Sequence, residues 1–80
     1  MAPSMDTRVI HHIEKLVEEE QRLYAKEGLE EKDRQRITQI GVELDQCWDF
    51  LRQRRALRDA GKNPDEAHLR PPEIVEKYLQ

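Results

Sequence analysis

The chain has 80 residues and a mass of 9.6 kDa, so it can form one domain at most. Charged residues (39 %) outnumber apolar ones (36 %). Leu, Ile, Val and Phe together number 18, about 22 % of the chain, close to the roughly 20 % below which disorder is expected. The few apolar side chains must therefore be spaced efficiently against the chain's own segments or against a second copy.

Composition excludes several classes of protein. No apolar run approaches the roughly 18 residues that a membrane span needs, so no membrane partner is expected. Residues 1–6 lack the basic and apolar regions of a signal peptide, which favours a cytosolic location. The single cysteine, Cys47, excludes an internal disulfide, and without a CxxC pair it excludes a cysteine zinc site.

Charge alternates along the chain. Residues 1–31 carry a net charge of −4, residues 32–62 carry +3, and residues 63–80 carry −2. An acidic segment followed by a basic one is expected of two helices that lie against each other.

The first predicted helix covers residues 6–27, with Ser4 or Asp6 as the N-cap and Gly28 as a C-cap in the left-handed conformation. Several of its apolar residues lie three or four positions apart, as do Ile13 and Leu16 or Ile13 and Val17, which indicates an amphipathic helix. The apolar residues of this helix are Val9, Ile10, Ile13, Leu16, Val17, Leu23 and Tyr24.

The second predicted helix covers residues 30–60 and ends before Gly61. Its apolar stripe has the heptad spacing of a helix packed along another helix, and consists of Ile37, Ile40, Leu44, Cys47 and Leu51. Gly41 and Trp48 flank this stripe. Because glycine costs about 1 kcal/mol relative to alanine inside a helix, we expect a neighbouring helix to approach closely at Gly41.

The remaining residues predict a loop over 61–71 and a short helix over 72–79. Asn63 is expected to cap a single turn that starts at Pro64. The pair Pro71-Pro72 forces the preceding residue, Arg70, out of the helical region.

A turn at Gly28-Leu29 predicts an antiparallel hairpin in which the numbers of facing residues add to about 57. Ile40 would then face Val17, Leu44 would face Ile13, and Cys47 would face Ile10. The predicted fold is all-α: a two-helix hairpin with a short C-terminal helix, contained in a single domain. Because one hairpin cannot enclose a core, either the C-terminal helix docks on it or two copies form a four-helix bundle.

Two stretches, LDQCWDFLRQRRA at residues 44–56 and RPPEIVEKYLQ at residues 70–80, carry a resemblance. The chain resembles a family of short actinobacterial proteins catalogued as a domain of unknown function, over nearly its whole length. The resemblance implies a small cytosolic helical protein without an assigned activity, and it transfers no catalytic or binding residues. The chain departs from similar sequences after the turn, where Leu29-Glu30-Glu31 replaces the usual Ser or Asp cap.

Several side chains have alternative explanations. His11 and Glu14 lie one turn apart, as metal ligands can, but the motifs of helical metal sites are absent and solvated histidines are expected. Cys47 lies on the apolar stripe, which favours a core residue over a nucleophile. Trp48 is expected to pack within the hairpin or at a dimer interface, with Arg52 available to stack on its ring.

The end of the second helix carries four arginines that the shorter first helix is not expected to cover: Arg52, Arg54, Arg55 and Arg58. They are expected to contact either an anion or the chain's own acidic C-terminal segment, whose acids are Asp65, Glu66, Glu73 and Glu76. An overall charge of −3 and a pI near 5.6 argue against nucleic acid as the partner.

The favoured function is a non-enzymatic interaction protein that forms a homodimer and needs no cofactor or metal. Its packing or dimer interface is expected to involve Ile10, Ile13, Val17, Ile37, Ile40, Gly41, Leu44, Cys47, Trp48 and Leu51. The alternative is a weak binder of nucleic acid or anionic ligands that uses the four arginines. No nucleophile paired with a base, phosphate loop or ligand cluster indicates an enzyme.

Overall fold

A computed structural model describes residues 4–71 of the chain. Its elements are the α-helices α1 (Met5–Tyr24) and α2 (Glu31–Asp59) and the single 3-10 turn η1 (Pro64–Glu66), without a strand among these residues. The chain forms two compact units, Met1–Leu44 and Asp45–Gln80, and α2 contributes residues to both. The predicted all-α class is confirmed.

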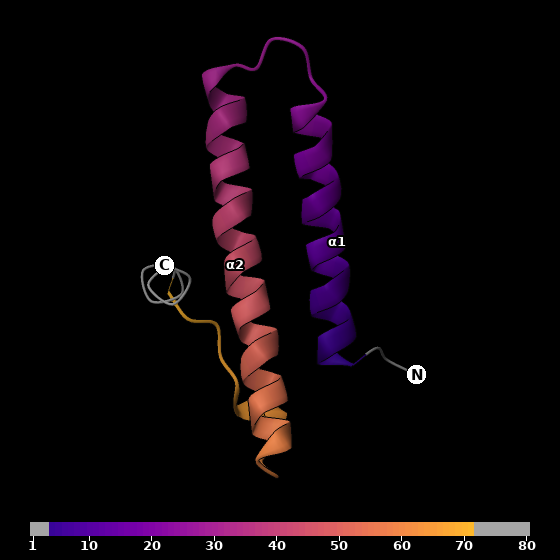
Figure 1. Ribbon diagram of the computed structural model, residues 1–80, viewed down its shortest axis with the longest axis vertical. Helices are drawn as coiled ribbons and strands as arrows, with labels where there is room; N and C mark the ends of the chain where they lie inside the picture. Colours follow the sequence, from indigo (N-terminus) through magenta and orange to yellow (C-terminus); the bar gives the residue numbers. More distant parts are fainter. Residues whose placement is uncertain (1–3, 72–80) are drawn as a thin grey trace. The chain divides into compact units, whose positions relative to one another are not determined.

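In the first unit, α1 and the first half of α2 form an antiparallel hairpin (Figure 1). Two polar pairs join the helices. Arg36 donates from Nε and Nη2 to the carboxylate of Glu19 at 2.6 and 2.8 Å, and His12 Nε2 lies 2.8 Å from Glu43 Oε1. The residue numbers add to 55 in both pairs, within two residues of the predicted 57.

The buried apolar residues of this unit are Ile13 and Leu16 from α1 and Ile40 from α2. Ile40 is fully buried, at 0 % exposure. At the edge of the interface, the hydrogen bonds from Arg36 lower the pKa of Glu19, and the same contact raises the pKa of Arg36. Both shifts favour the charged forms, so the pair persists as an ion pair at neutral pH.

The ends of α1 differ in how well the sequence predicts them. The Ser4 hydroxyl accepts a hydrogen bond from the Thr7 N–H at 3.2 Å, which confirms Ser4 as the N-cap. The predicted C-cap at Gly28 is wrong, because α1 ends at Tyr24, where the N–H of Ala25 donates to the carbonyl of Gln21. Gly28 is left-handed, with φ +69°, but it lies in the connection.

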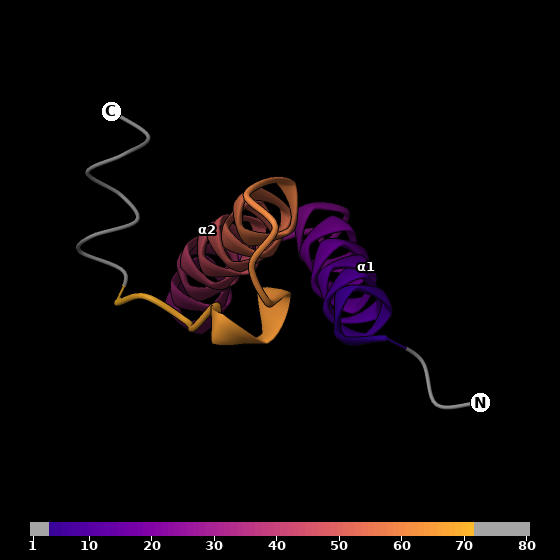
Figure 2. The same cartoon turned by 90° about the horizontal axis from the view of Figure 1, so that it is seen from below.

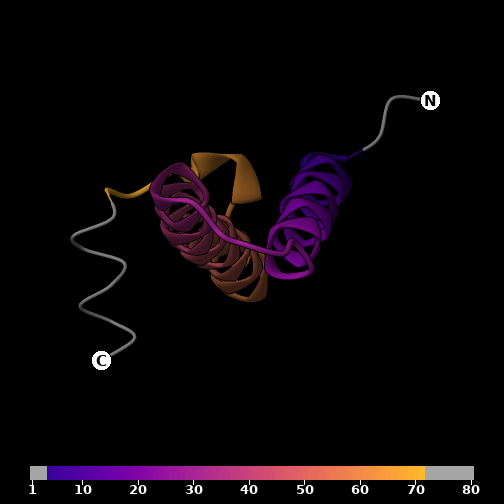
Figure 3. The same ribbon diagram turned by 90° about the horizontal axis from the view of Figure 1, so that it is seen from above.

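The connection between the helices spans residues 25–30 (Figure 3) and is longer than the predicted turn at Gly28-Leu29. It is held by a cluster that we call the turn clamp: Lys26, Glu30 and Asp33. The Asp33 Oδ2 atom accepts from the Glu30 N–H at 3.0 Å and from Lys26 Nζ at 2.9 Å. This is half of a capping box, and it compensates for the Ser or Asp cap that the sequence lacks before α2.

The turn clamp predicts an acid-sensitive component of stability. The hydrogen bond from the Glu30 N–H, and secondarily the one from the Lys26 ammonium, lower the pKa of the Asp33 carboxyl below its ordinary value. A lowered folded-state pKa adds stability that is present above the unfolded pKa and is lost as pH falls through the folded pKa. The free energy of unfolding, measured by urea denaturation, is therefore expected to fall between pH 5 and a pH below 3. This fall should be smaller for the Asp33→Asn variant than for the parent. The same acid-induced loss in both proteins would contradict this role, and Glu31→Gln, at an exposed position, is the matched control.

Gly41 lies inside α2 with open space around it. No heavy atom outside the local helix backbone lies within 4 Å of a Cβ built at this position. The predicted close approach of a neighbouring helix is therefore wrong within the described structure.

Two glycine variants are expected to change stability in opposite directions. The Gly41→Ala variant should gain about 0.5–1 kcal/mol in free energy of unfolding, because alanine has the higher helix propensity and meets no clash. The Gly28→Ala variant should lose about 1–2 kcal/mol, because φ +69° is strained for a residue with a Cβ. Urea denaturation measures both, and a destabilised Gly41→Ala variant would show that a neighbour does approach there.

The second unit contains the rest of α2 and the segment that follows it. Gly61, with φ +72°, ends α2 in a Schellman motif: the Lys62 N–H donates to the Leu57 carbonyl at 2.8 Å and the Gly61 N–H to the Arg58 carbonyl at 3.0 Å. Asn63 accepts from the Asp65 N–H and caps η1, as predicted.

We call residues 62–71 the return segment, because the chain turns back after Gly61 and runs alongside the second half of α2 (Figures 1 and 2). After η1 it has neither helix nor strand as far as Pro71. The predicted helix over 72–79 lies outside the described residues. In residues 4–71, no helix is long and apolar enough to cross a membrane.

Candidate interaction site

One face of α2 holds the return segment through main-chain oxygens. Gln46 donates to the Arg70 carbonyl at 3.1 Å, Gln53 to the His68 carbonyl at 2.8 Å, and Arg54 to the Pro64 carbonyl at 3.1 Å. These three donors and Asp49 lie at helical spacing, and we call them the polar seam. The amide and guanidinium groups of the polar seam thus hold the main chain of the return segment, and Arg54 and Asp49 also pair with its side chains.

Arg54 is the most buried arginine of the four that the sequence singles out, with an exposure of 6 %. Besides the Pro64 carbonyl, it contacts Asp65 Oδ1 at 3.1 Å, and its guanidinium lies 6.0 Å from the ring centroid of Phe50. Of the two contacts that the sequence analysis expects for the four arginines, an anion or the acidic C-terminal segment, Arg54 makes the second, with Asp65. Its charge is thus compensated by the chain itself.

Asp49 is a second buried charge in the polar seam. Its Oδ2 atom lies 3.2 Å from Arg70 Nε and accepts from Gln53 Nε2 at 2.9 Å. Sequence reasoning missed Gln46, Asp49 and Gln53 as binding residues. Their spacing of three and four was visible, but polar residues at this spacing are typical of a solvated helix face.

The remaining arginines, Arg52, Arg55 and Arg58, are exposed. Two of them, Arg52 and Arg55, line a shallow hollow of about 290 Å³ together with Trp48 and Leu51. Trp48 is 52 % exposed, so the second unit does not bury it. Within residues 4–71 the cation–π contact is that of Arg54 with Phe50, and the expected stacking of Arg52 on Trp48 is not observed.

The predicted packing residues differ in exposure. Ile13, Ile40 and Cys47 are buried, and Ile10 and Trp48 are exposed. Intermediate exposure is found for Val17, Ile37, Gly41, Leu44 and Leu51. Ile10 and Trp48 are thus not packed within the described residues, and each lies to one side of the stripe that faces inward. Their role at a dimer interface stays a prediction.

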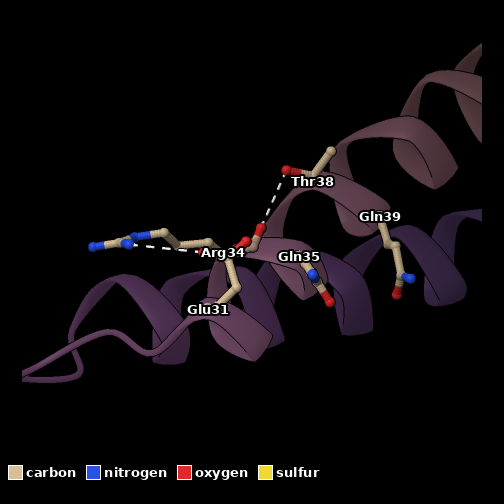
Figure 4. A pocket seen from close by; sticks show the side chains of 5 residues that line it. All are labelled: Glu31, Arg34, Gln35, Thr38 and Gln39. Carbon is tan, nitrogen blue, oxygen red and sulfur yellow. Dashed lines mark hydrogen bonds and ion pairs between the residues drawn. The ribbon is translucent and has the colours of Figure 1, made fainter.

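Two other hollows are weaker candidates for a binding site than the hollow beside Trp48. One of about 340 Å³ lies on the first half of α2, where Glu31, Arg34, Gln35, Thr38 and Gln39 line it (Figure 4). Three of its residues contact one another, with Arg34 near Glu31 and the Thr38 hydroxyl donating to the Arg34 carbonyl. The other, of about 390 Å³, lies between the end of α2 and the return segment and has Ala56, Leu57 and Ala60 among its lining.

The candidate metal and nucleophile residues are placed as follows. His11 and Glu14 are exposed, and the neighbouring His12 contacts Glu43. The part of the chain that the structure describes has no group of three or more His, Cys, Asp or Glu arranged to hold a metal ion. Cys47 is buried and is not part of a disulfide.

Comparison with known proteins agrees with the resemblance seen in the sequence. Residues 5–80 match the family described as "Protein of unknown function (DUF2630)". The chain belongs to this family. It is also 48 % identical over 77 residues to "Uncharacterized protein Rv0898c" of Mycobacterium tuberculosis and, equally, to "Uncharacterized protein Mb0922c" of Mycobacterium bovis, covering 91 % of this chain and 88 % of each relative. No solved structure matches.

Proposed function

We propose that this family member is a non-enzymatic interaction module that self-associates through the exposed Trp48 side of α2. The exposure of Trp48, at 52 %, is the observation that carries the proposal. A tryptophan left half in water on a rigid helix is the residue type most enriched at interface hot spots. Its neighbours fit such a site, since arginine is also enriched there and Leu51 adds apolar surface to the same hollow.

Contacts of the polar seam make α2 rigid near Trp48. The return segment covers the seam side of α2 by hydrogen bonds, so Trp48 stands on a helix whose other side is already occupied. A preordered helix loses little conformational freedom on binding, which favours association.

The alternative function, binding of an anion or a nucleic acid, has less support because Arg54 is bound to its own chain. Arg52 and Arg55 are exposed, but Arg54 is committed to Pro64 and Asp65. The cytosolic location expected from the sequence stays a prediction.

Self-association predicts that the molar mass rises with concentration and that Trp48 becomes buried. Because Trp48 is the single tryptophan, its fluorescence reports its own environment. Light scattering across the micromolar to millimolar range should show a transition from one chain to two, accompanied by a blue shift of the emission. The Trp48→Ala variant should stay a single chain throughout.

The matched control is Leu69→Ala, which removes an exposed apolar side chain from the return segment of the same unit. This variant should associate like the parent. A parent protein that remains a single chain at every concentration, or a Trp48→Ala variant that pairs as well as the parent, would contradict the proposal.

A further inference from the structure

The Trp48 side of α2 carries charges in an order that complements itself. Asp45, Trp48, Arg52 and Arg55 follow one another at steps of three, four and three, so they lie on one face of the helix. We call these four residues the tryptophan face. An acid stands at its start, two bases stand at its end, and the aromatic ring lies between them.

We propose that the partner of this face is the same face of a second copy, with the two α2 helices antiparallel. This inference rests on the proposed function and specifies its partner and geometry. With a two-fold axis near residue 50, Asp45 of one copy lies opposite Arg55 of the other, and Trp48 lies opposite Arg52. Each pair then occurs twice, and all four residues meet a complementary group.

The side chains of this face are available for such pairing. Within residues 4–71, Asp45, Arg52 and Arg55 take part in no ion pair, and Arg52 and Arg55 are exposed. The guanidinium of Arg52 would stack on the indole of the partner copy, a contact whose strength grows when water is excluded. The ion pairs between Asp45 and Arg55 would lie toward the ends of the contact, where they fix register and orientation.

A parallel pair would place like charges together. Asp45 would meet Asp45 and Arg55 would meet Arg55 of the second copy, and juxtaposed like charges oppose association. The charge order therefore selects the antiparallel arrangement.

Charge reversal tests the pairing directly. The full-length variants Asp45→Arg and Arg55→Asp each turn both ion pairs into repulsive contacts, so each alone should associate at least about tenfold more weakly than the parent. An equimolar mixture of the two variants should recover association, because every acid again faces a base. Light scattering measures the mass, and native mass spectrometry identifies the mixed pair.

The control is a reversal away from the face, Glu66→Arg, at an exposed position of the return segment. This variant should associate like the parent. Single variants that pair as strongly as the parent, or a mixture that recovers nothing, would overturn the antiparallel pairing while self-association through Trp48 still stood. A parent that never associates, in contrast, would remove the proposed function itself.

Helix orientation can be measured independently. Spin labels on an Asp59→Cys variant, made with Cys47→Ala so that one thiol remains, should lie about 27 Å apart along the helix axis in the antiparallel pair, since residue 59 is nine residues from the two-fold axis. Spin labels with no separation along the helix axis would mean a parallel pair and would contradict the inference. The fluorescence emission of Trp48 is compared between the variant and the parent before the spin label is attached. Equal emission shows that the variant still forms the pair.

Discussion

Replacing Ile40 by alanine is expected to lower the free energy of unfolding by about 3 kcal/mol. Ile40 is the fully buried side chain of α2, at 0 % exposure, and it lies in the unit where α1 contributes the buried Ile13 and Leu16. The loss combines the transfer of the removed methyl and methylene groups with the cavity they leave. In a chain with so few apolar residues, neighbouring side chains have little means of filling that cavity.

The matched control is Ile10→Ala on α1. It deletes the same atoms, but Ile10 is 43 % exposed, so its effect should stay within about 0.5 kcal/mol. Urea denaturation followed by helical circular dichroism gives both values, and equal slopes show that the variants unfold from comparable states. If both variants lost the same free energy, Ile40 would not be the centre of the hairpin core.

The predictable part of this fold is its helical hairpin. Apolar residues at steps of three and four determine which side of each helix turns inward, and Ser4, Gly61 and Asn63 act locally on the adjacent backbone. Such signals depend on near neighbours in sequence, so they can be recognised without knowing the tertiary structure. The end of α1 was mispredicted because Asp33, eight residues after Ala25, organises the connection by binding Lys26 and Glu30.

The polar seam was not predictable for a different reason. Its donors resemble a solvated helix face in the sequence, and their acceptors are main-chain carbonyls, which leave no trace in residue type. What the sequence did show was a resemblance carried by residues 44–56 and 70–80. The structure brings these two stretches together where Arg70 meets Asp49 and where Gln46 binds the Arg70 carbonyl.

The two flanks of α2 have different roles. On one flank, the buried charges of Asp49 and Arg54 are satisfied by side chains and a main-chain carbonyl of the chain itself, and on the other, Trp48 and two arginines remain exposed. The basic end of the helix is therefore not one surface with one partner. Arg54 contacts the chain's own residues, whereas Arg52 and Arg55 are exposed and belong to the surface proposed for self-association.

Replacing Arg54 by alanine should release the return segment while leaving the hairpin of the first unit intact. The variant loses charge-assisted hydrogen bonds to the Pro64 carbonyl and to Asp65, and the cation–π contact with Phe50. The buried bond to the Pro64 carbonyl contributes about 1.5–3 kcal/mol, and the pair with the exposed Asp65 adds little, so we expect a loss of about 2 kcal/mol in the local stability of the segment. Trypsin cleavage after Lys62 should then become about thirtyfold faster, because cleavage tracks the population of the open segment.

Two controls separate this role from a general effect of charge. The Asp65→Asn variant keeps Arg54 on the Pro64 carbonyl and alters a side chain that is 73 % exposed, so cleavage should change little, in line with about 0–1 kcal/mol for a surface pair. The Arg55→Ala variant removes the adjacent guanidinium, which is exposed, and should leave cleavage after Lys62 unchanged when measured at concentrations where the protein is a single chain. Equal acceleration in the Arg54 and Arg55 variants would show that net charge, rather than the buried contact with the main chain, holds the segment on α2.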